Sequence, residues 1–184
     1  VGEVMSIGSN FQESFQKAIR SMENGLNGLS TVLKDNEGNG ALKLELSTPG
    51  EKRLWFIADA FRRGWSMDEV FVSCKVDKWF LHQIKDIVDD EISITKKNLD
   101  QIEANEMKSY KKKGFSDARI ANLLKINEQS VREHRYKLKV HPVFKRVDSC
   151  AAEFDSTTNY LYSTYDEFNE SEVSSKKKIV VLGS

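Results

Sequence analysis

The sequence contains little cysteine and little histidine. Its two cysteines, Cys74 and Cys150, are far apart and form no Cys-x-x-Cys pair. The three histidines are scattered: His82, His134 and His141. Zinc sites need His and Cys ligands at short, regular spacings. The sequence therefore predicts no metal-binding residue.

The chain also lacks proline, a charge bias and long apolar runs. Only Pro49 and Pro142 are present, and the stretch between them is free to be helical because proline breaks helices from within. Lys and Arg number 28, as do Asp and Glu, so the chain as a whole has no net attraction to nucleic acid or membrane surfaces. No apolar run approaches the roughly 18 residues that span a bilayer. Since no signal-like leader opens the sequence, we expect a cytoplasmic protein without a membrane partner.

What is present is enough apolar material for a core. Hydrophobic residues make up 39%, including ten Phe and three Trp, which excludes wholesale disorder. A length of 184 residues suits one domain, or one domain with attached ends. The last residues, Ile-Val-Val-Leu-Gly after a lysine run, are typical of the first strand of a parallel sheet. Because one strand alone is unstable, the sequence predicts a fragment of a longer protein.

Apolar periodicity predicts helices along most of the chain. Asn10 can cap a first helix, which Gly25 and Gly28 end. Its apolar stripe is Phe11, Phe15, Ala18, Ile19 and Met22. Further helices are expected over 51–63, over 67–74 with Ser66 as its cap, and after Asp77, which can cap the last of them. The last of these should bury Phe80, Leu81, Ile84, Ile87 and Val88. Residues 34–41 have the composition of a loop, and alternating leucines over 42–46 fit a short strand or a loop edge equally well.

Residues 114–138 have the pattern of a helix-turn-helix. Ser116 can cap a helix with Ile120, Leu123 and Leu124 on one face, and Asn127 can cap a second helix. The second helix should turn Val131 and Leu138 inward. Its cations are expected to face outward: Arg132, Arg135 and Lys137. Such a pair of helices is common in DNA-binding proteins.

The same pattern occurs twice. Gly64-Trp65-Ser66 and Gly114-Phe115-Ser116 are 50 residues apart, and at that offset Lys75-Val76-Asp77 matches Lys125-Ile126-Asn127. Val70, Cys74, Leu81 and Val88 fall on Ile120, Leu124, Val131 and Leu138. This duplication predicts a mainly α fold, an orthogonal helical bundle built from a duplicated helical unit, with short extended segments at the ends. After Pro142, residues 143–148 and a tyrosine-rich stretch over 159–165 are expected to be extended, and residues 166–175 to form an acidic linker.

Two functional alternatives can be weighed on these residues. Residues 105–146 hold twelve Lys or Arg against four acids, which would suit a basic helix-turn-helix that binds nucleic acid. Residues 148–172 carry seven acids and no base, so the two stretches can also neutralise each other inside one protein. Glu128 and Glu133 would meet phosphates unfavourably on the presumed recognition helix.

A catalytic site is not predicted. Cys150 lies beside two alanines with no histidine nearby to activate it. His82 and His134 lie on predicted helices without a matched acid. Leu182-Gly183-Ser184 could open a phosphate-binding loop, but no Gly-rich loop is complete. We therefore predict no catalytic residue and no cofactor-binding residue.

A series of short segments gives a more specific indication. In chain order they are residues 2–8 (GEVMSIG), 13–14 (ES), 16–18 (QKA), 53 (R), 57–64 (IADAFRRG), 79–81 (WFL), 114–117 (GFSD), 147–154 (VDSCAAEF), 162–165 (YSTY) and 181–183 (VLG). This ordered series resembles the large subunit of carbamoyl phosphate synthase at the join between its two ATP-using halves. Residues 34–48 match no pattern of that family.

The resemblance implies an organisation and a role. Residues 1–24 would end the first ATP-grasp half, 25–147 would form the helical oligomerisation domain, 148–175 a connector and 176–184 the first strand of the second half. The family makes carbamoyl phosphate from bicarbonate, glutamine-derived ammonia and two ATP, with magnesium or manganese, for arginine and pyrimidine synthesis. Its ATP and metal residues lie outside this stretch, so the fragment itself should be structural. The implied partners are other large subunits and a small glutamine-amidotransferase subunit, with no nucleic acid.

Overall fold

The computed structural model describes residues 3–34, 36–151, 153–155 and 158–181. The chain divides into two compact units, Val1–His141 and Pro142–Ser184. The first unit is helical and the second contains a two-stranded sheet. The prediction of a mainly helical fold is confirmed. Within the described residues, no helix combines the length and the apolar character that crossing a membrane requires.

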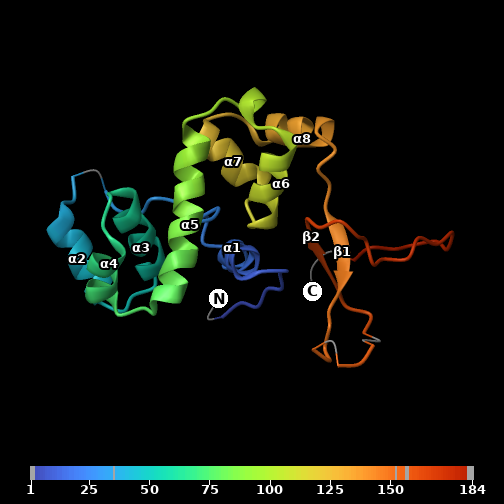
Figure 1. The fold of residues 1–184 in the computed structure, drawn as a ribbon, viewed down its shortest axis with the longest axis horizontal. Coiled ribbons are helices and arrows are strands. Elements are labelled where there is room, and N and C mark those ends of the chain that lie inside the picture. The colour runs from blue at the N-terminus through green and yellow to red at the C-terminus, as the bar shows by residue number, and fades with distance from the viewer. Residues whose placement is uncertain (1–2, 35, 152, 156–157, 182–184) are drawn as a thin grey trace. The chain divides into compact units, whose positions relative to one another are not determined.

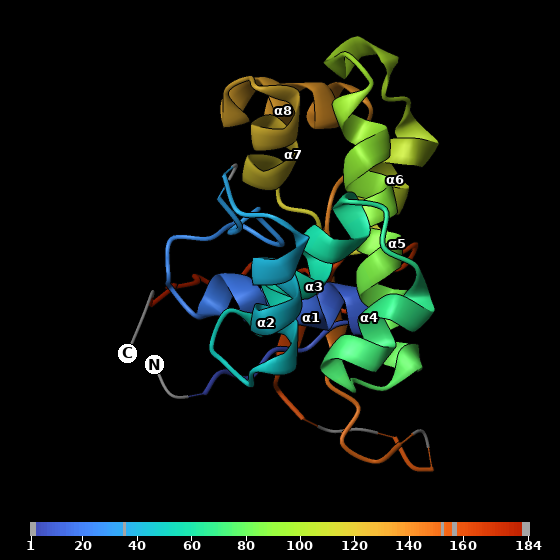
Figure 2. The same cartoon turned by 90° about the vertical axis from the view of Figure 1, so that its left-hand side faces the viewer.

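Helix α5 is the axis of the first unit. The helical elements are α1 (Phe11–Ser21), α2 (Asn39–Ser47), α3 (Arg53–Arg62), α4 (Met67–Cys74), α5 (Lys78–Thr95), the 3-10 turn η1 (Leu99–Gln101), α6 (Ala104–Lys112), α7 (Asp117–Leu124) and α8 (Glu128–Lys137). Figure 1 shows α2, α3 and α4 on one side of α5 and α6, α7 and α8 on the other, and Figure 2 shows the same groups from the side. Because α3, α4 and α7 all contact α5, one helix supports both groups.

The core of this unit consists of aliphatic and aromatic side chains at helical spacing. On α5, Leu81, Ile84 and Ile87 have at most 1% of their surface exposed. Trp55 of α3 and Phe115, just before α7, are the largest fully buried side chains. Burying a side chain of this size contributes about 1.5–3 kcal/mol, so the core is the main source of stability.

The predicted duplication is present in the backbone of two joints. We name the turn between α3 and α4 the first joint (residues 62–66) and the turn between α6 and α7 the second joint (residues 112–116). Gly64 and Gly114 both adopt left-handed φ angles, +81° and +92°, which glycine adopts without strain. Ser66 and Ser116 then cap the next helix, each accepting from the backbone N–H three residues later.

The ends of the short helices also match. Lys75 and Lys125 both occupy the left-handed region, at φ 58° and 57°. Asp77 and Asn127 follow at equivalent positions, and their side chains accept from the first turns of α5 and α8. The two copies therefore share their backbone geometry from the glycine joint to the start of the following long helix.

Two of the wrong predictions concern α2 and α5. Residues 42–46 are neither strand nor loop edge but part of α2, because Leu42 and Leu46 lie four residues apart and are fully buried on one helical face. Leu44 is 65% exposed instead. Phe80 was expected in the core of α5 but is 44% exposed.

The apolar stripe predicted for α1 is buried at Ile19 and partly buried elsewhere. The buried residues of this helix are Gln12, Glu13, Gln16 and Ile19, so its polar side faces the protein. Phe11 and Phe15 are only partly buried. Each buried polar side chain has a partner: Gln16 donates to a backbone carbonyl, Gln12 donates to Asp86, and Glu13 accepts from Ser9.

In the second unit, β1 (Val143–Arg146) and β2 (Leu161–Thr164) pair antiparallel, with Val143 opposite Thr164 and Arg146 opposite Leu161. Extended structure was predicted for both segments and is confirmed. The predicted terminal strand is not formed over residues 179–181, which are irregular and exposed, and its remaining residues lie outside the described part of the chain. The predicted domain boundaries stay predictions.

Candidate functional site

Four charged side chains form a buried ion-pair network between the two groups of helices. The members of this network are Asp59, Arg62, Glu91 and Arg119. The Arg119 Nε–Glu91 Oε1 distance is 2.7 Å, and the Arg62 Nη2–Glu91 Oε2 distance is 2.5 Å. Arg62 also contacts Asp59 at 2.7 Å. With two cations and two carboxylates, the network is electrically balanced, as buried charges need to be.

The same network holds the segment that follows α1. Asp59 Oδ2 accepts from the backbone N–H groups of Val32 and Leu33, at 3.0 and 2.9 Å. Arg119 donates to the Leu29 carbonyl and the Ser30 hydroxyl, both at 3.0 Å. Arg62 also donates to Leu29 O. The network thus fixes residues 29–33 to α3, α5 and α7.

A second buried cluster lies at the start of α7. Asp117 accepts a bidentate contact from Arg135, with the closest N···O distance at 2.8 Å, and contacts Lys111 at 2.9 Å. Burial alone would raise the pKa of Asp117, but the hydrogen bonds and charges of Arg135 and Lys111 outweigh it and lower that pKa. Burial lowers the pKa of Lys111, although Asp117 opposes this shift. The cluster joins α6, α7 and α8.

Helix α1 covers the second joint through side-chain hydrogen bonds to three consecutive carbonyls. Asn10 Nδ2 donates to Lys112 O at 2.9 Å, and Gln16 Nε2 donates to Lys113 O at 2.9 Å. Arg20 Nη1 donates to Gly114 O at 2.7 Å. These are carbonyls that the end of a helix leaves without an internal partner. The polar face of α1 is therefore buried for a specific reason.

The arginines of the helix-turn-helix do not all face solvent. Arg119 and Arg135 are 7% and 6% exposed, so the prediction that Arg135 points outward was wrong. Arg132 is exposed and pairs with Glu128 at 2.8 Å. Lys113 pairs with Asp90, and Lys145 contacts Asp166 and Glu170. Much of the basic stretch is neutralised inside the protein, which does not support the nucleic-acid interpretation.

The histidines and cysteines take structural positions. His134 Nε2 lies 2.8 Å from Ile102 O, and His82 is exposed. Cys74 is buried and Cys150 is partly exposed, and both are free thiols. In the part of the chain that the structure describes, no group of three metal-ligating side chains is close enough to hold an ion.

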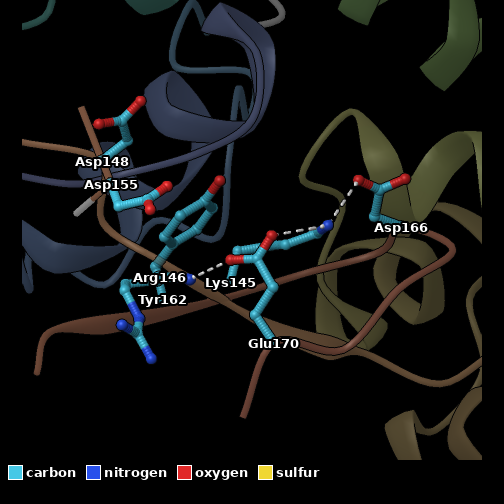
Figure 3. A pocket seen from close by; sticks show the side chains of 7 residues that line it. All are labelled: Lys145, Arg146, Asp148, Asp155, Tyr162, Asp166 and Glu170. Carbon is cyan, nitrogen blue, oxygen red and sulfur yellow. Dashed lines mark hydrogen bonds and ion pairs between the residues drawn. The ribbon is translucent and has the colours of Figure 1, made fainter. Parts of the chain in front are cut away.

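The second unit contains an open hollow of about 810 Å³. Figure 3 shows its lining: Lys145, Arg146, Asp148, Asp155, Tyr162, Asp166 and Glu170. Glu170 accepts from Lys145 Nζ at 3.2 Å and from the Arg146 backbone N–H at 2.7 Å. Both contacts lower the pKa of Glu170, the Arg146 N–H more strongly. These polar groups serve to fix the Glu170 segment against β1.

An exposed group of aromatic rings lies on α1 and the start of α5. This aromatic cluster consists of Phe11, Phe15, Trp79 and Phe80, with ring centroids 5.0 to 5.5 Å apart. Trp79 and Phe80 are 51% and 44% exposed. The sequence predicted an inward Phe80 and an apolar stripe that includes Phe11 and Phe15, but not this cluster. The adjacent aromatic pair Trp79-Phe80 was the available signal, because neighbouring residues on a helix point in different directions.

Comparisons with known proteins agree with the helical unit. Residues 3–139 match the family model of the carbamoyl-phosphate synthetase large chain, oligomerisation domain. The chain is 51% identical over 185 residues to the carbamoyl phosphate synthase large chain of Pseudomonas aeruginosa and 48% identical over 183 residues to that of Neisseria meningitidis serogroup B. The large chain of Pasteurella multocida is 49% identical over 183 residues. Each match covers 100% of this chain but 17% of the relative.

Proposed function

Because the chain belongs to the family of the carbamoyl phosphate synthase large chain and contains its oligomerisation domain, we propose that it is the structural, self-associating part of such an enzyme. The chain spans about 17% of the length of the relatives it matches. The whole protein would make carbamoyl phosphate from bicarbonate, glutamine-derived ammonia and ATP in the cytoplasm, as the resemblance implies. Its small glutamine-amidotransferase subunit would be a further partner.

The state of the buried charges supports a structural role. A catalytic acid, base or nucleophile needs a group that is free to react. The carboxylates of Asp59, Glu91 and Asp117 are instead held by arginines. The described residues do not fit ATP or a divalent ion, since they offer neither a metal-ligating group nor a Gly-rich phosphate loop. No chemical step is therefore assigned to this chain.

The aromatic cluster supports a surface for self-association. Tryptophan and phenylalanine are enriched in the centres of protein interfaces, where they supply most of the binding energy. A patch on the surface of one subunit can meet the same patch of a second subunit across a two-fold axis. Two half-exposed rings held by two further rings form a rigid patch of this kind.

Sedimentation of the 184-residue chain tests the proposal. We expect a dimer that dissociates on dilution. Trp79→Ala should raise the dissociation constant of this dimer at least tenfold, as truncating an interface anchor does. Tyr136→Ala is the matched control, because Tyr136 is an aromatic residue of similar exposure, 54%, outside the cluster. A strict monomer at high concentration, or equal weakening by both variants, would contradict this surface.

Two further measurements separate the structural role from its alternatives. The purified chain should not hydrolyse ATP in the presence of bicarbonate and magnesium, and appreciable turnover would refute the structural role. A nucleic-acid binder would show affinity for duplex DNA that falls steeply with added salt. We expect no such binding, since Arg119 and Arg135 are engaged in buried ion pairs.

A further inference from the structure

The two joints share one backbone but not one environment. Gly114 is buried, and a Cβ added there would lie 2.9 Å from Glu13 Cα. Gly64 is exposed, and a Cβ added there would meet no atom within 4 Å. The two glycines differ because α1 packs on the second joint, whereas no equivalent helix among the described residues packs on the first joint.

The carbonyl groups of the two joints show the same contrast. At the second joint, the carbonyls of residues 112, 113 and 114 accept from three side chains of α1 and its cap. At the first joint, the equivalent carbonyls belong to Arg62, Arg63 and Gly64. No donor from residues 3–34, 36–151, 153–155 or 158–181 is hydrogen-bonded to any of these three oxygens. They form an acceptor row at the negative end of α3.

A groove of about 380 Å³ is lined by Trp65, which directly follows the acceptor row, and by residues of α2 and α4. Trp65 and Glu69 line it and are partly or fully exposed. Their equivalents in the second copy, Phe115 and Arg119, are 1% and 7% exposed. There the loop after α1 supplies the cover: a Cβ at Gly28 would touch the Arg119 side chain at 3.5 Å.

We propose that the first joint and its groove bind an α-helix as the second joint binds α1, and that this helix comes from the part of the longer polypeptide outside residues 1–184. The proposal rests on the proposed function, which makes this chain a piece of a protein about six times its length, since each match covers 17% of its relative. The helix carries amide and guanidinium side chains at the spacing of Gln16 and Arg20, four residues apart on one face. The residue of this helix that lies against Gly64 is equivalent to Glu13 of α1, three residues before the amide equivalent to Gln16.

The charges near the first joint define the occupant further. Cations are favoured at a helix end that presents free carbonyls. Glu69, in the first turn of α4, and Lys43 line the groove with one carboxylate and one cation, while Asp68 is already paired with Lys78 at 2.6 Å. The exposed part of Trp65 offers an apolar surface to the occupant. An amphipathic helix that presents amide and guanidinium donors to the carbonyls and an apolar face to Trp65 satisfies these conditions.

Thiol labelling tests whether a segment of the full-length protein covers the first joint. A cysteine is introduced by Arg63→Cys, at an exposed position of the first joint, in both the full-length protein and the 184-residue chain. Gln129→Cys, on the exposed side of α8, is the matched control. Maleimide labelling of each peptide is followed by mass spectrometry over a range of protein concentrations. We expect the residue-63 cysteine to label at least tenfold more slowly in the full-length protein than in the short chain, at every concentration, while the control labels equally.

The following results would refute the proposal that a helix of the full-length protein binds the first joint. Equal labelling of the residue-63 cysteine in both proteins would show that nothing covers the first joint. Protection that appears only as concentration rises would assign the joint to a second copy. A photo-crosslinker attached to the same cysteine should capture one helical peptide containing Gln or Asn and Arg, and capture of a strand or an acidic segment would refute the stated chemistry. Self-association through Trp79 is measured separately by sedimentation, so either proposal can fail while the other stands.

Discussion

Replacing Arg119 with methionine tests whether the buried ion-pair network stabilises the fold. The substitution keeps an unbranched side chain of similar length but removes the contact to Glu91 and the hydrogen bonds to Leu29 and Ser30. Removing one partner of a buried ion pair typically costs 3–5 kcal/mol, because the other charge stays buried. Glu91 retains Arg62 at 2.5 Å, so we expect a loss near the lower limit, about 3 kcal/mol.

Urea denaturation followed by tryptophan fluorescence measures this loss. Trp55 is 1% exposed and donates to Gly28 O at 3.0 Å, so it reports on the segment that the network holds. The midpoint should fall while the slope of the free energy against urea stays constant. Arg132→Met is the control, since the exposed pair of Arg132 with Glu128 should contribute about 0.3–0.5 kcal/mol.

A double-mutant cycle completes the test. Glu91→Gln combined with Arg119→Met removes both charges of the pair and leaves Arg62 with Asp59. We expect the double variant to lose less free energy than the sum of the two single losses, by about 1–3 kcal/mol, as contacting residues do. If Arg119→Met costs no more than Arg132→Met, or if the two losses simply add, the network does not stabilise the fold in the way argued.

Three further outcomes are expected. The cationic partners of Asp117 lower its pKa below the ordinary 3.8, so the ionised carboxylate stabilises the fold above that pH. The difference in unfolding free energy between the wild type and Asp117→Asn should therefore shrink as pH falls through the lowered pKa. A difference that does not change with pH, measured by urea titration, would refute this. Gly64→Ala should lower the free energy of unfolding by about 1–2 kcal/mol, because alanine is strained at this left-handed φ. Gly114→Ala should lower it by about 1–3 kcal/mol more, because α1 lies against Gly114. Equal losses of stability in thermal unfolding would contradict the packing. Lys75→Gly and Lys125→Gly should each raise stability by about 0.5–1 kcal/mol by relieving left-handed strain, whereas glycine at an exposed position inside α8 should lower it.

Local signals in the sequence predicted the helix starts well. Ser66, Asp77, Ser116 and Asn127 each cap the helix that they were expected to cap. A cap depends on a side chain and a backbone N–H two or three residues later, so both partners lie within the same short stretch of sequence. The fold class followed from these starts and from the apolar spacing between them.

The buried polar groups could not be predicted in the same way. Periodicity counts apolar residues, so it assigned Arg135 to the outer face and did not indicate that the polar side of α1 faces the protein. The partners that decide these positions are distant in sequence: Arg135 is 18 residues from Asp117, and Gln16 of α1 is 97 residues from Lys113. An arginine is buried only when such a partner is supplied, and no local pattern reports this.

The alternating leucines over residues 42–46 failed for a related reason. A spacing of two is compatible with a strand, but its first and third members are four apart and share a helical face. Leu42 and Leu46 are fully buried against the rest of the α2–α4 group, and this packing decides between the two local possibilities. Tertiary contacts therefore overrode a local pattern that was ambiguous.

The two joints have the same backbone geometry but different neighbours. Gly64 and Gly114 have nearly the same backbone because each joint is built by its own few residues, which the repeat reproduces. Their exposure differs because α1 covers the second joint, and no other helix of the described residues covers the first. An internal repeat thus predicts the geometry of its copies but not their neighbours. Where one copy is covered and the other is bare, the covered copy shows what kind of segment the bare one can bind.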